Sequence, residues 1–191
     1  MKKVFITLFC IGFLPFMVKA QATYPFGTIM KRIFDDASKS FAKADASAKA
    51  TLGALQPDGS WSDINYQARD ISKCAPVNHL EKTHLLIQAY VNKGGSYYNN
   101  KAFLDAIIKA YEYWYATDPK SDNWWHNEIS VPQRLGESLI LLKFGDSYLP
   151  EELEKKLLER MKRGVAEDKT GANKTDIAMH YFYRALLTED K

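Results

Sequence analysis

The 191-residue sequence is poor in cysteine, and it has no long apolar run after its first twenty residues. Its two cysteines are Cys10 and Cys74, and Cys10 lies inside the N-terminal apolar segment. Because only Cys74 remains outside that segment, an internal disulfide is excluded and packing must hold the fold together. The lack of a later apolar run of about twenty residues excludes a membrane span beyond the N-terminus.

The N-terminal segment has the pattern of a secretory signal peptide. Two lysines precede an apolar stretch from Val4 to Val18, and a small-residue site ends at Ala20. We predict that residues 1–20 are a signal peptide and that residues 21–191 are exported. No membrane contact is expected after cleavage.

Charge and motifs exclude several classes of function. Three of the 26 basic residues belong to the signal peptide, which leaves 23 basic against 23 acidic residues and predicts no nucleic-acid partner. The four histidines have no metal-ligand spacing such as His-Glu-x-x-His, and no phosphate loop, dinucleotide motif or nucleophile elbow is present. The histidine spacing therefore predicts no metal site.

The remaining chain is predicted to be helical throughout. Apolar residues recur at helical spacing, and turn-rich breaks separate the recurrences. The spacing of Ile29, Ile33, Ala37 and Phe41 indicates a first helix, and Ser130 with Gln133 has capping-box spacing. Further helices are expected over residues 80–93, 101–116, 130–143, 150–163 and about 173–187.

These helices are expected to form one domain of antiparallel hairpins. Helix 80–93 would pair with 101–116, and helix 130–143 with 150–163, whereas helix 173–187 opens a pair whose partner is missing from the sequence. We therefore predict an all-α array of helical hairpins that stops part-way.

Trp124 and Trp125 stand side by side in the polar stretch SDNWWHNEIS. Neighbouring side chains point about 100° apart on a helix and to opposite faces on a strand, so both rings do not easily enter one core. Either the rings cap the helical core, or they form a platform on which sugar rings stack. We expect one of them at a groove surface, in contrast to Trp114, which we expect in the core. In the second interpretation four polar neighbours bind sugar hydroxyls: Asn123, His126, Asn127 and Glu128.

A second candidate site is the stretch KTGANKTD, in which Asn173 precedes the last predicted helix. Asn173 could be a helix N-cap, whose side-chain oxygen would accept from the backbone N–H of Thr175 or Asp176. Alternatively, its amide could donate to a substrate carboxylate at the helix N-terminus. It also begins an N-x-[ST] sequon, which matters only in a host that glycosylates it.

These two stretches resemble polysaccharide lyase family 8, which includes chondroitin AC, hyaluronan and xanthan lyases. Residues 118–142 and 170–187 carry the resemblance, with the Asn-Trp-Trp and Gly-Ala-Asn-Lys-Thr-Asp motifs inside them. Residues 30–36, 51–66 and 159–164 fit as well, so the resemblance covers nearly all of the predicted mature chain. Within the family, the sequence is most similar to the chondroitin AC lyases.

The resemblance implies a fold and a reaction. It implies the N-terminal part of an α/α toroid built of helical hairpins, followed in the family by large antiparallel β domains. Family members cleave uronic-acid polysaccharides by β-elimination, in which hydrogen bonds neutralise the uronate carboxylate and stabilise the enolate-like charge. By this resemblance Asn173 is the catalytic asparagine, and Trp124 and Trp125 belong to the aromatic patch that positions the glycan chain. Asn123 is the polar neighbour that we expect to bind the glycan beside them.

Other residues of the family's active site have no match in this sequence. The family's histidine and its tyrosine base lie farther downstream than Lys191, and the family's assisting arginines and glutamate have no match either. Tyr181 and Tyr183 are too close to Asn173 to take the role of the base. We therefore expect a truncated N-terminal part of a lyase, without activity of its own.

Three functions remain open on the sequence: part of an exported lyase, a glycan-binding module that does not cut, and a non-functional product. The resemblance implies a polysaccharide partner, which would be chondroitin, hyaluronan or a related glycan. It implies no cofactor, because β-elimination needs only proton transfer and charge stabilisation. We also expect a monomer in the periplasm or outside a bacterial cell. Which glycan is preferred and whether cutting is endo or exo depend on loops that this sequence does not contain.

Overall fold

The computed structural model describes residues 25–145 and 147–189, so the predicted signal peptide lies outside the described residues. Within these ranges regular structure is helical, apart from one isolated bridge between Leu55 and Trp61. The all-α prediction is confirmed. The elements are α1 (Phe26–Ser38), α2 (Phe41–Gly53), α3 (Val77–Val91), α4 (Lys101–Thr117), a π-helical turn η1 (His126–Ser130), α5 (Val131–Phe144), α6 (Glu151–Arg160), a 3₁₀ turn η2 (Ala166–Asp168) and α7 (Gly171–Thr188).

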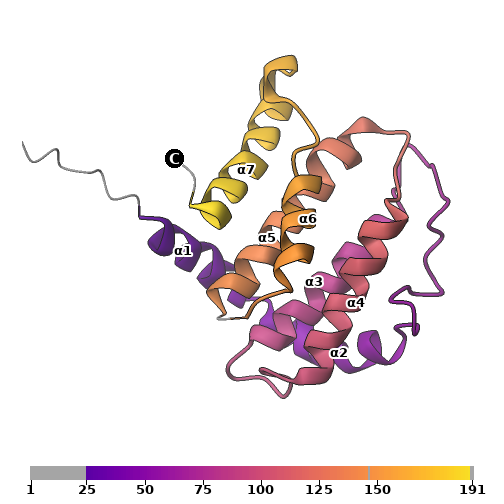
Figure 1. The fold of residues 1–191 in the computed structure, drawn as a ribbon, viewed down its shortest axis with the longest axis vertical. Helices are drawn as coiled ribbons and strands as arrows, with labels where there is room; N and C mark the ends of the chain where they lie inside the picture. The colour runs from indigo at the N-terminus through magenta and orange to yellow at the C-terminus, as the bar shows by residue number, and fades with distance from the viewer. Residues whose placement is uncertain (1–24, 146, 190–191) are drawn as a thin grey trace, which may run out of the picture.

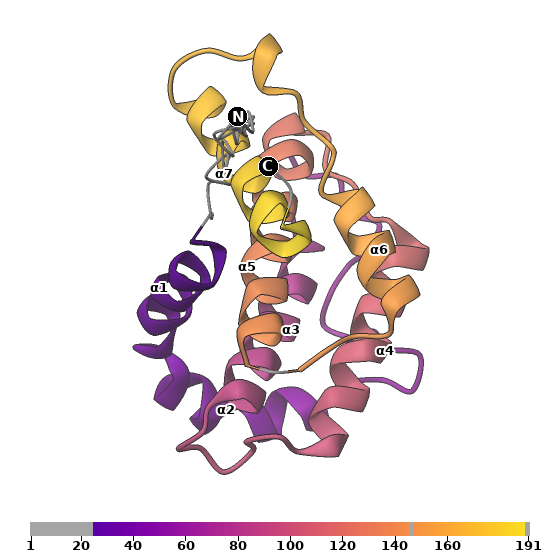
Figure 2. The ribbon, with the colours of Figure 1, turned by 60° about the vertical axis from the view of Figure 1, so that its left-hand side comes forward.

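Helix α5 is the centre of the fold. It contacts α1, α3, α6 and α7, and it lies between α1 and α6 in Figure 2. Its buried residues occupy every side of the helix, which is the pattern of a helix surrounded by others. They are Val131, Pro132, Leu135, Gly136, Ser138, Leu139, Ile140, Leu141 and Leu142.

Consecutive helices pack as antiparallel hairpins, as predicted. Helix α3 packs against α4, and α5 packs against α6, while α2 crosses the base of α3 (Figure 1). Helix α7 lies on α5 and beside the end of α1. None of the described helices is both long and apolar enough to cross a membrane.

The first predicted helix is divided in two, which corrects the continuous helix implied by the spacing from Ile29 to Phe41. Helix α1 ends at Ser38, and Phe41 opens α2. The hydroxyls of Ser38 and Ser40 donate to the carbonyls of Asp35 and Ala37, at 2.7 and 2.8 Å. Serine side chains that bond nearby carbonyls compete with the helical N–H donors and favour helix ends. Phe41 still reaches the core, where 4% of it is exposed.

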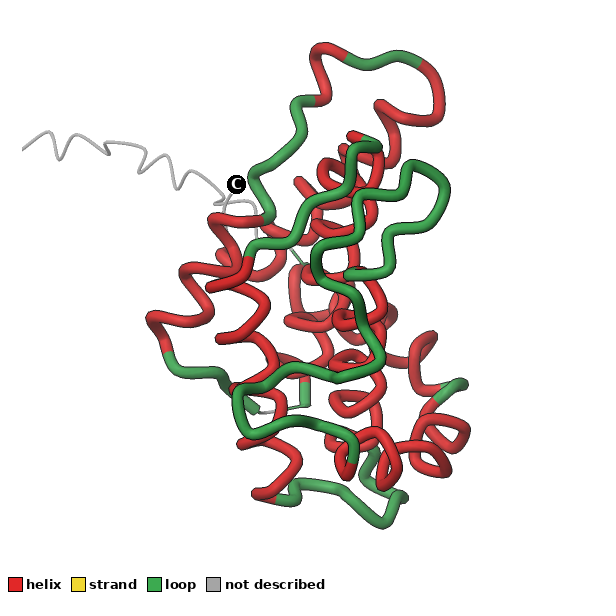
Figure 3. The backbone as a smooth tube through the Cα atoms, turned by 90° about the vertical axis from the view of Figure 1, so that its right-hand side faces the viewer, coloured by secondary structure: helices red, strands yellow, loops and turns green. Residues whose placement is uncertain are grey.

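The long connection between α2 and α3 runs along the outside of the helices. It climbs past α4 to the end of the molecule where α3 begins (Figure 3). There its residues Asp70 and Ile71 meet the loop that precedes η1, because their carbonyls accept hydrogen bonds from Ser121 and Asn123, at 3.1 and 3.0 Å. This junction carries the tryptophan pair.

Candidate functional site

Trp124 and Trp125 are exposed, unlike the two other tryptophans. They are 39% and 37% exposed, whereas Trp61 and Trp114 are 0% and 2% exposed. The expectation that separated Trp114 from the pair is therefore confirmed. The pair opens a helix that continues through the π-helical turn η1 into α5. A π-helical turn inserts an extra residue into a helix, and such turns are frequent at functional sites.

Asn123 holds the start of that helix. Its side-chain oxygen accepts from the backbone N–H of Trp125 at 3.0 Å, and its amide donates to the carbonyl of Ile71 at 3.0 Å. Asn123 is thus the N-terminal cap of the tryptophan-bearing helix. Ser130 is not a cap, because it lies inside the continuous helix and makes no capping bond. The predicted capping box at Ser130 and Gln133 is wrong for this reason.

Side-chain hydrogen bonds close the loop that precedes the tryptophan pair. Asn127 accepts from the backbone N–H of Ser121 at 3.0 Å and donates to its carbonyl at 2.7 Å. The Ser121 hydroxyl accepts from the backbone N–H of Asn123 at 3.0 Å. These bonds hold the loop in one conformation, so the two indoles are presented on a fixed support.

A pocket of about 190 Å³ adjoins Trp125. Its wall includes Arg134, whose guanidinium pairs with Glu81 and Glu137, each at 2.8 Å. Burial raises the pKa of the Glu137 carboxyl, and the nearby Arg134 opposes that shift. An indole beside fixed charged and amide groups suits a ligand with one apolar face and several hydroxyls. The pocket is lined by Glu81, Trp125, Ser130, Gln133, Arg134 and Glu137.

Asn173 lies in the first turn of α7, and it is not the helix cap. Helix α7 begins at Gly171, which has a φ of +58°, and its cap position is Thr170. The N-cap interpretation of Asn173 is therefore wrong. Asn173 is half-buried, and its amide makes no hydrogen bond to any described residue. Its donor and acceptor remain available at the helix N-terminus.

Helix α7 brings Asn173 close to the element that carries the tryptophans. The Gln133 amide, which lines the Trp125 pocket, donates to the carbonyl of Asp176 at 2.8 Å. Helix α7 also contacts η1 and α5 directly. Residues 124–125 and 173 therefore lie on adjoining elements, although 48 positions separate Trp125 from Asn173.

Lys169 is a site residue that the sequence did not reveal. Its ammonium lies 4.2 Å from the ring centroid of Trp124 and 3.2 Å from the carboxylate of Glu128. Forty-five positions separate Lys169 from Trp124, and no local spacing signals such a pair. The ion pair between Arg134 and Glu81 is also not signalled by any local spacing. The ion pair between Arg134 and Glu137 could be predicted, because the two residues have the i, i+3 spacing of a helical pair. Among the described residues, no three His, Cys, Asp or Glu side chains are grouped to hold a metal ion.

Comparison with known proteins decides the family. Residues 25–191 match the model of the polysaccharide lyase family 8 N-terminal alpha-helical domain. The chain belongs to polysaccharide lyase family 8. The predicted resemblance is confirmed, and so is the fold class, because the described helices form an incomplete α/α toroid built of helical hairpins.

Relatives within polysaccharide lyase family 8 are longer than this chain. The chain is 51% identical over 195 residues to chondroitinase-AC of Pedobacter heparinus, and it spans 28% of that protein's length. A solved chondroitinase AC lyase, studied as enzyme–oligosaccharide complexes, matches with a TM-score of 0.82 and 53% sequence identity. The match covers 86% of this chain and 25% of the length of that lyase. Paenibacillus xanthan lyase has the same fold at a TM-score of 0.71 and 17% identity, over 87% of this chain and 18% of its own.

Proposed function

We propose that this chain is the N-terminal part of an exported polysaccharide lyase that cleaves chondroitin or hyaluronan by β-elimination. The observation that carries the proposal is the 51% identity with chondroitinase-AC over the whole of this chain. The exposed tryptophan pair supports it, and so does the amide of Asn173 on an adjoining helix, which has no hydrogen-bond partner in the part of the chain that the structure describes.

The proposed roles follow from the chemistry of the elimination. A base removes the proton from C5 of the uronate, the bond from C4 to the bridging oxygen breaks, and that oxygen receives a proton. The C5 proton is only weakly acidic beside an ionised carboxylate, so a donor to that carboxylate stabilises the charge that develops. Asn173 is proposed as this donor. The base would come from the part of the enzyme that the longer relatives contain and this sequence does not.

Trp124 and Trp125 are proposed to bind the glycan by stacking on its sugar rings. Asn123 is proposed to act at the same surface by holding the pair, since both of its polar groups already bond the protein. Export rests on the signal-peptide pattern of residues 1–20. A monomer without cofactor is part of the same proposal.

A chimera tests the lyase proposal. Residues 25–191 replace the matching segment of the Pedobacter heparinus chondroitinase-AC, and the ultraviolet absorbance of the unsaturated uronate product is followed on chondroitin sulfate. We expect an active chimera and no product from the 191-residue chain alone, because acid–base catalysis contributes about 10²–10⁴-fold. A folded chimera without activity would contradict the proposal, and so would activity of the chain alone at the rate of the chimera.

Replacing Trp125 by alanine should weaken glycan binding by about 1–3 kcal/mol, the usual loss for one aromatic stacking contact. Chondroitin oligosaccharides are titrated into the full chain, and affinity is measured by calorimetry. Tyr148→Ala is the matched control, since Tyr148 is an exposed aromatic residue (63%) in the loop before α6. Equal affinities of the wild type and Trp125→Ala would contradict the stacking role and would indicate that the pair only covers the helical core.

A further inference from the structure

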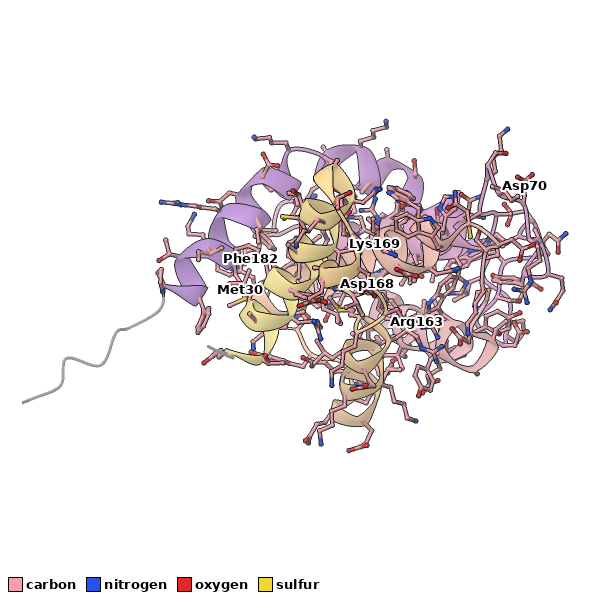
Figure 4. All side chains as sticks on the ribbon, turned by 90° about the horizontal axis from the view of Figure 1, so that it is seen from above. Met30, Asp70, Arg163, Asp168, Lys169 and Phe182 are labelled. Atoms are coloured by element: carbon pink, nitrogen blue, oxygen red, sulfur yellow. The ribbon has the colours of Figure 1, made fainter. Side chains whose placement is uncertain are left out.

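One face of Trp124 is covered by a cation. The Lys169 ammonium lies 4.2 Å from the centroid of the indole, within the distance at which a cation is attracted to an aromatic face. Lys169 belongs to the connection between η2 and α7, and it follows Asp168, which is labelled beside it in Figure 4. That face of the indole is occupied, so a sugar that stacks on Trp124 uses the other face, and the ammonium can reach only those glycan groups that extend past the edge of the ring.

The Lys169 ammonium keeps capacity for another partner. Among the described residues it meets the Glu128 carboxylate at 3.2 Å and the Trp124 ring. The side chains of Lys169 and Glu128 are 23% and 29% exposed, so water reaches the pair only in part. Because an ammonium has three N–H donors, it can hold Glu128 and still donate to a second anion.

The connection that carries Lys169 is anchored to η1. Gly164 has a φ of +91°, and a Cβ there would lie 2.7 Å from the carbonyl oxygen of Glu128, so the two backbones are in close contact. The backbone N–H of Ala166 donates to the Tyr181 hydroxyl at 3.1 Å. That hydroxyl in turn donates to the Gly164 carbonyl at 3.3 Å. Lys169 is thus positioned before any ligand arrives, which lowers the entropic cost of binding.

We propose that Lys169 is an anion-binding residue of the tryptophan platform, where it pairs with a carboxylate or sulfate group of the bound glycan. It stands four positions before Asn173, on the connection that leads from the face of Trp124 into α7. A charged group of a glycan that contacts both Trp124 and Asn173 is therefore expected within reach of its ammonium. This inference rests on the proposed function, because it names the residue that binds the negatively charged groups of the proposed glycan substrate.

The roles of Lys169 and Glu128 predict effects of opposite sign. Lys169→Met keeps an unbranched side chain on the indole and removes the charge, so affinity for chondroitin sulfate oligosaccharides should fall about tenfold, the loss of a charge-assisted hydrogen bond. Glu128→Gln keeps an oxygen beside the ammonium and removes the competing negative charge. Affinity should then rise about two- to fivefold.

The experiment titrates the full chain calorimetrically with chondroitin sulfate oligosaccharides at low and at about 0.15 M ionic strength, where the Debye length is about 8 Å. Lys169→Arg should bind within a few-fold of the wild type. Lys155→Met, which removes an exposed lysine of α6, is the control for loss of net charge. Unsulfated chondroitin separates the two anions: a Lys169→Met defect on both glycans assigns the carboxylate, and a defect on the sulfated chain alone assigns the sulfate.

The outcomes separate this inference from the proposed function. Wild-type chain that binds no acidic glycan overturns this inference, whereas the lyase proposal is judged by the activity of the chimera. Binding by the wild type with an unchanged Lys169→Met variant overturns the role of Lys169 alone. A parallel loss in Lys169→Met and Glu128→Gln also overturns it, because a pair that only braces the loop would lose affinity in both variants.

Discussion

Replacing Asn173 by aspartate in the active chimera should lower kcat by about 10²–10³-fold, the range seen when one donor to a developing negative charge is removed. The substitution removes the amide N–H and adds a negative charge beside the uronate carboxylate. It should not harm folding, because a carboxylate in the first turn of α7 interacts favourably with the helix dipole. The measurement compares kcat with the melting temperature of the same protein.

A neighbouring substitution separates charge from the lost donor. Ala172→Asp places the same negative charge in the same turn, at an exposed position. It should retain most of kcat, whereas Asn173→Ala should lose much of it without any added charge. A folded Asn173→Asp chimera with wild-type kcat would show that the amide does not contact the reacting uronate.

Lowering the pH from 7 to 5 should destabilise the folded chain by several kcal/mol. Burial lowers the pKa of His79 to about 4, of His84 to about 3 and of His180 to about 4. All three rings are nearly or fully inaccessible to solvent, with exposed fractions of 0%, 8% and 0%. The surroundings of His79 fit the neutral ring, which bonds the Tyr66 hydroxyl at 2.9 Å and the Ala110 carbonyl at 2.8 Å.

The direction of this pH effect follows from proton binding. An unfolded histidine has a pKa of about 6.5, so between pH 6.5 and about 4 the unfolded chain binds more protons than the folded chain. The stabilisation is therefore complete above pH 6.5 and is lost as the pH falls towards 4. Each histidine contributes at most about 1.4 kcal/mol per pH unit, which sets a limit of about 4 kcal/mol per unit for the three. The raised pKa of Glu137 acts in the opposite direction.

Urea unfolding followed by circular dichroism at pH 7, 6 and 5 measures this slope. His180→Leu is the informative variant, because neither ring nitrogen of His180 has a partner among the described residues. Removing this buried ring, which has no hydrogen-bond partner among the described residues, should leave the free energy of unfolding at pH 7 unchanged or raise it. It should also reduce the change in that free energy with pH by up to about 1.4 kcal/mol per pH unit, the contribution of one proton. A free energy of unfolding that stays constant from pH 7 to 5 would contradict the prediction.

Much of the fold could be predicted because helix formation and burial follow local patterns. The apolar stripe of α4 placed Trp114 in the core, and the adjacent indoles of Trp124 and Trp125 could not share that environment. Helix ends were less predictable, since they depend on competing hydrogen bonds. Ser38 and Ser40 divide the first helix by bonding nearby carbonyls, and Asn123 starts the helix that leads into α5 well before Ser130.

By itself, the sequence determined the all-α class, the family, and the two candidate stretches at Trp124–Trp125 and Asn173, because each depends on residues close together in the chain. Only the tertiary structure decided how those stretches meet. The α5–α7 contact through Gln133 and Asp176 brings them onto adjoining elements, and the close approach of Gly164 to Glu128 carries Lys169 to the face of Trp124. Such pairings depend on which helix faces pack together, and no spacing within one helix specifies a partner more than forty residues away.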